Sequence, residues 1–529
     1  MYTTYTRPTS TGASWGEHVG LNCFTNSKQG FNGGKTIPPE PFSGSISLAG
    51  CEAACLKDAN CSAIVVPVLS PAPGPSPPSG SAKALQQKVV AAIASGTASL
   101  TIEGGAYNFG NSHFHIEGAT NLALLSPEPV QLFFTHNYGV NITNCDRLSL
   151  GNWTIDYESS TDSRPPPRFT FDRAGRITFN LLNSSRVHAS DLTIKHAGYM
   201  VVTAWNGYGA HRFTRLNFTP SLGKNCRDAL HFSDQRVGPT IEDSVVGYTG
   251  DDLFNIHTTL MVVLSCDAKS CLMVNPHLAD NPAEVNTVYG SNSVLGTVVP
   301  GDKMSFYSWL TDTFQTHRYG GTDTPPLTVA CTERISDKAL LQAAATLVPE
   351  LAHKGPALNP VSMRNDTVAW HAWDLWRVNF TGAVPVGVGR TAMVQIDSIS
   401  NAGTVLRNTT FTSTNCNFGR FKSSDSIIAG NVFENAGIKS LEMAWLPQFF
   451  EGPVVLSNVS VSSNTFIGSG NVTPVHCGPG CGLKGCLYNS GDRPTLPWTE
   501  KGCPLCPQCK NGVATPWTRD IRLENNSFR

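Results

Sequence analysis

The residues best suited to chemistry lie in two short stretches, 227–234 and 248–257. They contain four aspartates and two histidines, interleaved with apolar residues: Asp228, Asp234, Asp251, Asp252, His231 and His257. Alternation with a period of two predicts β-strands that bury one face and present acids and imidazoles on the other. Crowded carboxylates repel one another, so we expect one to be protonated while its neighbours stay ionised. A proton-donating acid beside an ionised base is what hydrolysis of a glycosidic bond requires.

The spacing of the aspartates predicts that they meet. Asp228 precedes Asp251 by 23 residues, so the two would be vertical neighbours in a chain that winds in coils of that length. Asp252 would point inward in a regular strand, and Gly250 provides the freedom for a bend that turns it outward. The alternatives for this cluster are a structural ladder of aspartates and a calcium site.

Two histidines accompany the acids. His231 follows Asp228 by three residues, and His257 follows Asp252 by five. We expect each imidazole to bind sugar hydroxyls or to influence a neighbouring carboxylate. A histidine that is hydrogen-bonded to a turn is the alternative for both.

A four-residue phrase of the form polar-x-x-apolar recurs along the chain, and its spacing predicts the fold. Its copies end at Ile194, Phe218, Val246, Phe411, Phe433, Phe466 and Phe528. Neighbouring copies are 24 residues apart (194 to 218), 28 (218 to 246) and 22 (411 to 433). A period of about 20–30 residues with short strands is typical of a right-handed parallel β-helix. Inward Ile, Val and Phe would form ladders along the axis, and outward residues of successive coils would line a groove.

The protein is therefore expected to be mainly β, with five regions. These are a small disulfide-rich domain at 15–68, a Pro/Ser/Gly linker at 69–82, early β-helix coils with the acidic site at 83–260, a β-barrel-like insertion at 261–391, and later coils at 392–529. A helix expected over 83–99 would close the open end of the first coil. A second helix-like run, 337–345, lies inside the insertion.

Cysteines mark two further segments. Cys23, Cys51, Cys55 and Cys61 resemble the pattern of the PAN/apple fold, which implies a secreted module that binds a protein or a glycan; a generic disulfide knot is the alternative. Residues 471–517 hold six cysteines and are expected to be a stapled loop, in which zinc ligation is the alternative to disulfides. Cys266 and Cys271 are expected to close a small loop.

Composition limits the partners and the compartment. The chain has 529 residues, a formal net charge of -1 and only 15% charged residues, so neither nucleic acid nor an anionic membrane is an expected partner. No run of about 18 apolar residues is present, so no membrane span is expected. Sixteen cysteines and eleven Asn-x-Ser/Thr sequons favour an extracellular or secretory protein. Residues 1–14 lack the apolar core of a signal peptide, and we expect the sequence to be incomplete at both ends.

Residues 83–470 resemble glycoside hydrolase family 110, the inverting α-1,3-galactosidases of the pectin-lyase-like β-helix superfamily. The resemblance rests on the Gly250-Asp251-Asp252 step with Asp228 one coil earlier, and on an insertion directly after this step. The rung at 181–200 and the later segments 419–437 and 450–453 add to it.

The resemblance implies an exo-acting hydrolase with a carbohydrate substrate and with neither cofactor nor metal. Asp228, Asp251 and Asp252 would be catalytic, one as the acid and the others activating water. The candidate substrate-binding residues are His231, His257, Arg420, Lys422 and Glu451, and solvated edge charges are the alternative for the last three. Trp205, Tyr199 and Trp445 are candidate aromatic platforms for a sugar.

Two other functions fit the same scaffold. Leu253 stands where many such enzymes carry glycine, which, together with the N-terminal module, favours a non-catalytic glycan-binding or adhesion protein. A polysaccharide lyase or epimerase would need a basic residue as proton acceptor, and Lys195 and Arg420 are the available cations.

Overall fold

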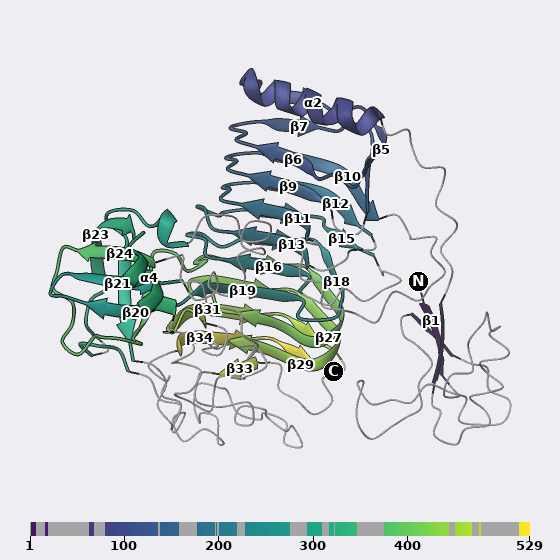
Figure 1. Cartoon of the computed structure of the whole chain (residues 1–529). Helices are drawn as coiled ribbons and strands as arrows, with labels where there is room; N and C mark the ends of the chain where they lie inside the picture. The colour runs from purple at the N-terminus through teal and green to yellow at the C-terminus, as the bar shows by residue number, and fades with distance from the viewer. Residues whose placement is uncertain are drawn as a thin grey trace.

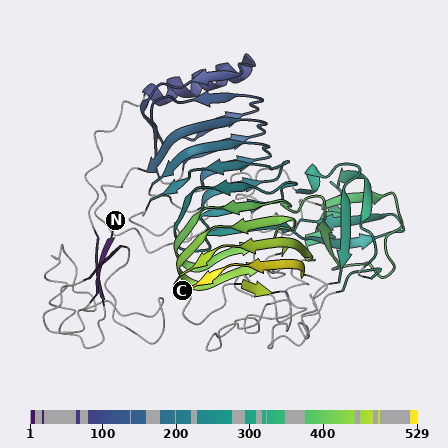
Figure 2. The ribbon, with the colours of Figure 1, turned by 180° about the vertical axis from the view of Figure 1, so that it is seen from behind.

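The structure is a computed structural model. It describes residues 2–6, 16–19, 63–67, 80–135, 138–157, 177–195, 197, 200–219, 228–275, 294–308, 317–321, 323–345, 347, 375–443, 450–467, 475–477 and 518–529. A 26-stranded sheet winds into a column of stacked coils, and a closed six-stranded barrel lies beside the column (Figures 1 and 2). The predicted parallel β-helix with a barrel insertion is confirmed.

The coils form in two blocks, before and after the barrel. The early strands are β4 (Ser99–Thr101), β5 (Gly105–Gly110), β6 (Phe114–Glu117), β7 (Ala123–Leu125), β8 (Val130–Phe134), β9 (Val140–Thr143), β10 (Ser149–Tyr157), β11 (Ile177–Leu182), β12 (His188–Ile194), β13 (Met200–Trp205), β14 (Arg212–Thr214), β15 (Asn217–Phe218), β16 (Leu230–Ser233), β17 (Thr240–Glu242), β18 (Val245–Thr249) and β19 (Phe254–Thr259). The later strands are β26 (Val405–Arg407), β27 (Thr410–Phe421), β28 (Ser426–Ala429), β29 (Val432–Met443), β30 (Glu451–Gly452), β31 (Leu456–Ser462), β32 (Thr465–Phe466), β33 (Val475–Cys477), β34 (Thr518–Glu524) and β35 (Ser527–Phe528).

The repeated phrase stacks on itself, as predicted from its spacing. Ile194 pairs with Phe218, and the late copies pair in series from Phe411 to Phe433 and Phe466. The rings of these three phenylalanines stack at centroid distances of 5.1 and 4.8 Å. The early coils therefore join the late coils in one continuous apolar core.

Each copy of the phrase begins with a residue in the left-handed backbone region. These residues are Asp191, Arg215, Asp243, Asn408, Gly430, Ser463 and Asn525. Glycine, asparagine and aspartate tolerate positive φ better than other residues, so the polar first position of the phrase marks a turn between two sides of a coil.

A helix closes the first coil. Helix α2 spans Gly80–Ala94, three residues earlier at its start than expected, and lies across the end of the column (Figure 1). Its apolar residues Leu85 and Val89 are buried against the core. Gln86 completes the contact, because its side-chain amide exchanges hydrogen bonds with the backbone of His115.

The barrel follows β19 directly. Its strands, in order of pairing, are β20 (Met261–Cys266), β21 (Ser270–Val274), β24 (Leu375–Phe380), β23 (Leu327–Arg334), β22 (Lys303–Tyr307) and β25 (Met393–Ile396). Strand β25 lies beyond the expected end of the insertion at 391, because it pairs with β20 and β22 to close the barrel. The expected disulfide between Cys266 and Cys271 joins β20 to β21.

Smaller elements complete the described chain. The barrel carries the short 3-10 helix η2 (Val294–Thr297) and helix α4 (Lys338–Ala345), which matches the expected helix-like run. Near the N-terminus, β1 (Tyr2–Thr6) pairs with β2 (Gly16–Val19) and β3 (Ala63–Pro67). The four cysteines of the proposed PAN/apple module, the linker up to residue 79 and nearly all of 471–517 lie outside the described residues. Neither described helix has the length and apolar character required to cross a bilayer.

Candidate active site

Three aspartates meet where two consecutive coils enter the same side of the column. Asp228 lies just before β16, and Asp251 and Asp252 lie just before β19. The Ala229 amide donates a hydrogen bond to the Asp252 carbonyl, which fixes the register between the two coils. One carboxylate oxygen from each aspartate lies within 4.8 Å of the others. The predicted meeting of the three acids is therefore observed.

The chain bends so that both members of the Asp251–Asp252 step reach this cluster. The left-handed residue is Tyr248, at φ 60°, and Gly250 is not among the residues with positive φ. The chain bends at Gly250 and Asp251, as predicted, although Gly250 does not adopt a positive φ there. Leu253, which follows the step, is fully buried in the column core, so the chain returns to the regular inward pattern at once.

Each of the two more buried acids lies against a basic side chain. Asp228 is 5% exposed and Asp252 is 1% exposed. The Asp228 Oδ2 atom lies 2.7 Å from His231 Nδ1, and the Asp252 Oδ2 atom lies 2.9 Å from Arg420 Nε. Asp251 is more exposed than either. The cluster therefore combines two buried carboxylates beside basic groups with one carboxylate nearer to solvent.

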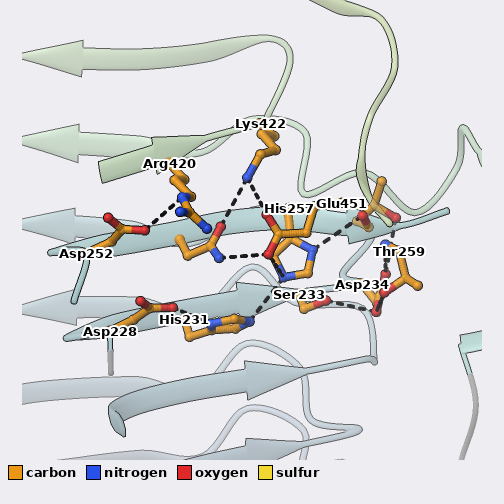
Figure 3. Close-up of polar contacts among 12 residues, drawn as sticks. Asp228, His231, Ser233, Asp234, Asp252, His257, Thr259, Arg420, Lys422 and Glu451 are labelled. Atoms are coloured by element: carbon orange, nitrogen blue, oxygen red, sulfur yellow. Dashed lines mark hydrogen bonds and ion pairs between the residues drawn. The ribbon is translucent and has the colours of Figure 1, made fainter. Parts of the chain in front are cut away.

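The two histidines form one unit. The Nε2 atoms of His231 and His257 lie 3.1 Å apart. Two lone pairs cannot form a hydrogen bond, so one of these nitrogens must carry a proton. The Trp205 ring stacks on His231 at a centroid distance of 4.6 Å. Figure 3 shows the chain of contacts that runs from Asp228 through both imidazoles towards Glu451.

A buried ion pair lies beyond His257. The Lys422 ammonium is 2.7 Å from Glu451 Oε2, and the Asn255 amide bridges the pair by donating to Glu451 and accepting from Lys422. Burial by itself would raise the pKa of Glu451, but Lys422, and then His257, hold that pKa well below its ordinary value. Glu451 is therefore an anion in a buried environment, where an unpaired charge would be costly.

Strand pairing brings these distant residues together. Asn255 of β19 pairs with Arg420 of β27 in the next coil. On the other side, Thr259 of β19 pairs antiparallel with Glu451 of β30. Strand β19 is therefore the element that positions every polar group of the site, either on itself or on a neighbour.

Asp234 anchors the end of β19. Its carboxylate accepts hydrogen bonds from the Ser233 hydroxyl and from both the amide and the hydroxyl of Thr259 (Figure 3). With so many donors around it, Asp234 holds the strand in place at the point where the column passes into the barrel.

The structure brings together all eight predicted site residues. Lys422 and Glu451 are buried, so the alternative that they are solvated edge charges is wrong, whereas direct contact with substrate stays a prediction for all five binding residues. Sequence reasoning missed Asn255, which lies two positions before His257 on the same strand face; period-two alternation is the signal that points to it. Of the candidate aromatic platforms, Trp205 is at the site, and Tyr199 and Trp445 lie outside the described residues.

Among the described residues, the same three aspartates are also a group that could hold a cation. Carboxylate oxygens are the ligands that Ca²⁺ prefers. The Arg420 guanidinium already lies beside Asp252, however, and a second positive charge at this carboxylate would be repelled. The arrangement therefore favours a cluster of acids that acts on protons and water over a calcium site.

Comparisons with known proteins add no family assignment. No protein-family profile matches the chain, and no curated protein is similar to it, so the resemblance to family 110 is not confirmed. Among solved structures, the chain is similar to the A-module of an Azotobacter vinelandii mannuronan C-5 epimerase, at 6% identity and a TM-score of 0.26, covering 85% of this chain and 93% of that one. It is also similar to a mannuronic acid-specific family 6 polysaccharide lyase from human gut microbiota, at 8% identity and a TM-score of 0.23, covering 74% and 75%. Neither similarity is close enough to support a conclusion about function.

Proposed function

We propose that the protein is a glycoside hydrolase whose catalytic groups are Asp228, Asp251 and Asp252. The observation that carries the proposal is that these three carboxylates lie within 4.8 Å of one another, two of them beside basic groups. An acid and a base at one place are the minimum requirement for hydrolysis of a glycosidic bond.

Asp228 and Asp252 are the two proposed general bases. His231 and Arg420 lie beside these two carboxylates and can hold them in place for a bound water. A water molecule can hydrogen-bond to two oxygens at about 2.8 Å each, so one water can bridge carboxylates whose oxygens are less than 4.8 Å apart. Such a water would donate a hydrogen bond to each carboxylate. These bonds orient the water and increase its nucleophilicity for direct attack on the anomeric carbon.

Asp251 is the proposed general acid. It is the most exposed of the three and is therefore the one best placed to reach the glycosidic oxygen of a bound glycan. The proton it donates would neutralise the departing sugar oxygen. The neighbouring anions favour its protonated form, because ionising a third carboxylate here would add further repulsion.

Direct attack by water predicts inversion at the anomeric carbon. Inverting acid–base pairs usually lie about 6.5–9.5 Å apart, and the acids here are closer. We attribute the short spacing to the third carboxylate, because two of the acids share one water instead of facing each other across the sugar. The substrate that the family resemblance implies is a terminal α-linked galactose.

The test is to incubate the full chain with α-1,3-linked galactosides and follow the released sugar by proton NMR. Release of galactose whose first anomer is β supports the proposal, because it shows inversion of an α-linkage. The Asp251→Asn variant serves as the control for contaminating activity. Equal release by both proteins would remove the proposal, and a new ultraviolet-absorbing product from a uronate polymer would favour a lyase instead.

We also propose that the protein acts outside the cell. The support is the disulfide between Cys266 and Cys271 together with the eleven sequons, since structural disulfides persist mainly in oxidising compartments. Glycan release by an endoglycosidase from protein made in its own host would test this; an unmodified chain would contradict it.

A further inference from the structure

A polar cavity lies at the junction between the barrel and the later coils. Its volume is about 310 Å³, at the lower end of the range of small-molecule sites. The barrel contributes Tyr307, Arg318 and Asp397 to its lining, and the coils contribute Ser424, Asp425 and Ser457. None of these residues belongs to the aspartate cluster.

The cavity wall is built from an ordered set of polar groups. The Asp397 carboxylate accepts hydrogen bonds from the Ser305 hydroxyl at 2.7 Å and from the Gln395 amide at 2.6 Å. Arg318 donates to the same Ser305 hydroxyl at 2.8 Å. Burial raises the pKa of Asp397 to about 6. Donors and acceptors are thus held in fixed positions in the cavity wall.

The cavity and the aspartate cluster are connected through shared segments of chain. Ser424 follows Lys422 by two residues, and Pro453, which also lines the cavity, follows Glu451 by two. The Thr258 hydroxyl donates to the Ile399 carbonyl, one residue before a third lining segment at 400–402. The two sites are therefore linked by three short segments of backbone.

We propose that this cavity binds one pyranose ring of a neutral sugar. The fixed donors and acceptors of the cavity wall match the hydroxyl groups of such a ring. Two carboxylates, Asp397 and Asp425, oppose a single guanidinium, Arg318, so the charge balance disfavours a uronic acid. The choice of a sugar as the ligand class rests on the proposed carbohydrate function, but the site itself does not.

The test is isothermal titration of the full chain with methyl α-galactoside, methyl α-glucoside, methyl α-mannoside and galacturonate. An Asp251→Asn background prevents turnover without touching the cavity. Two cavity variants are compared with it: Asp397→Asn, which changes the polar wall, and Ser457→Tyr, which fills the space from its rim. Arg377→Met, on the same barrel but outside the lining residues, is the matched control, and circular dichroism establishes that each variant is folded.

We expect at least one neutral sugar to bind, with an affinity reduced about tenfold or more by Asp397→Asn and with one binding site lost in Ser457→Tyr. Arg377→Met should bind as the background does. Unchanged binding in both folded cavity variants, a preference for galacturonate, or no binding of any neutral sugar would overturn the inference. Sugar binding in the cavity without any hydrolysis by the wild-type chain would refute the proposed hydrolase alone.

Discussion

Lys422 and Glu451 form an ion pair of 2.7 Å in which both side chains are almost completely buried. Lys422 comes directly after β27, and Glu451 begins β30, which crosses antiparallel onto the end of β19. The pair therefore joins two separate passes of the chain beside His257.

Removing one partner of this pair should destabilise the protein strongly. Lys422→Met or Glu451→Gln would leave an uncompensated charge in the interior, which typically costs about 3–5 kcal/mol. The free energy of unfolding from urea denaturation measures the effect. The double variant should lose much less than the sum of the two single variants. Two results would contradict this account. One is a double variant whose loss in the free energy of unfolding equals the sum of the two single losses. The other is single variants that lose as little stability as variants that break the exposed pair Asp191–Arg215.

Gly419 should be irreplaceable even by alanine. A Cβ atom there would overlap the Phe254 ring atoms Cε2, Cζ and Cδ2, and overpacking of this kind usually costs about 1–3 kcal/mol. The next residue is Arg420, so Gly419→Ala should also disturb the contact with Asp252 and lower activity. Thermal unfolding and activity assays measure both effects.

The controls for this prediction use a second glycine and a second site. Gly389→Ala, where an added Cβ meets no atom within 4 Å, should be nearly neutral. Phe254→Leu, combined with Gly419→Ala, should restore part of the lost stability because it makes room for the methyl group. If Gly419→Ala changed neither stability nor activity, the prediction would be wrong, because the coils would then be able to shift enough to accommodate the methyl group.

The coil spacing and the acid cluster could be predicted because both depend on local repetition. Asp228 and Asp251 are one coil apart, and the step from Phe411 to Phe433 in the phenylalanine ladder has nearly the same length. Pairing between neighbouring coils needs no knowledge of long-range contacts, which is why a period in the sequence was sufficient.

Other features depended on contacts that no period encodes. Strand β30 reverses direction to pair with β19, so the depth of Glu451 could not be read from its spacing. The barrel closes through β25, which lies beyond the end expected for the insertion.

His211 should make the protein less stable in mild acid. Burial lowers the pKa of this histidine to about 3, and its Nδ1 atom accepts a hydrogen bond from the Val187 amide. Between its pKa in the unfolded chain, about 6.5, and pH 3, the unfolded state binds a proton that the folded state does not. Stability is therefore lost as the pH falls through this window, by at most about 1.4 kcal/mol per pH unit.

The measurement is the melting temperature at pH 7 and at pH 5 for the wild type and for His211→Gln. The variant should lose less stability than the wild type on acidification, because glutamine does not titrate. His188→Gln, at a more exposed histidine, is the control. It should change the difference in melting temperature between pH 7 and pH 5 less than His211→Gln does. An identical pH dependence in wild type and His211→Gln would show that His211 is not kept neutral by its surroundings.

The most direct test of the central proposal is to compare kcat/KM for Asp228→Asn and Asp251→Asn on two substrates. One is an α-1,3-linked galactosyl oligosaccharide, whose leaving group needs a proton; the other is a nitrophenyl α-galactoside, whose leaving group does not. If Asp251 is the general acid, Asp251→Asn should lose about 10²–10⁴-fold on the oligosaccharide and keep most of its activity on the nitrophenyl substrate. Asp228→Asn, which removes a base, should lose activity on both. Equal losses on both substrates for Asp251→Asn, or full activity in either variant, would contradict the assignment of acid and base to these aspartates.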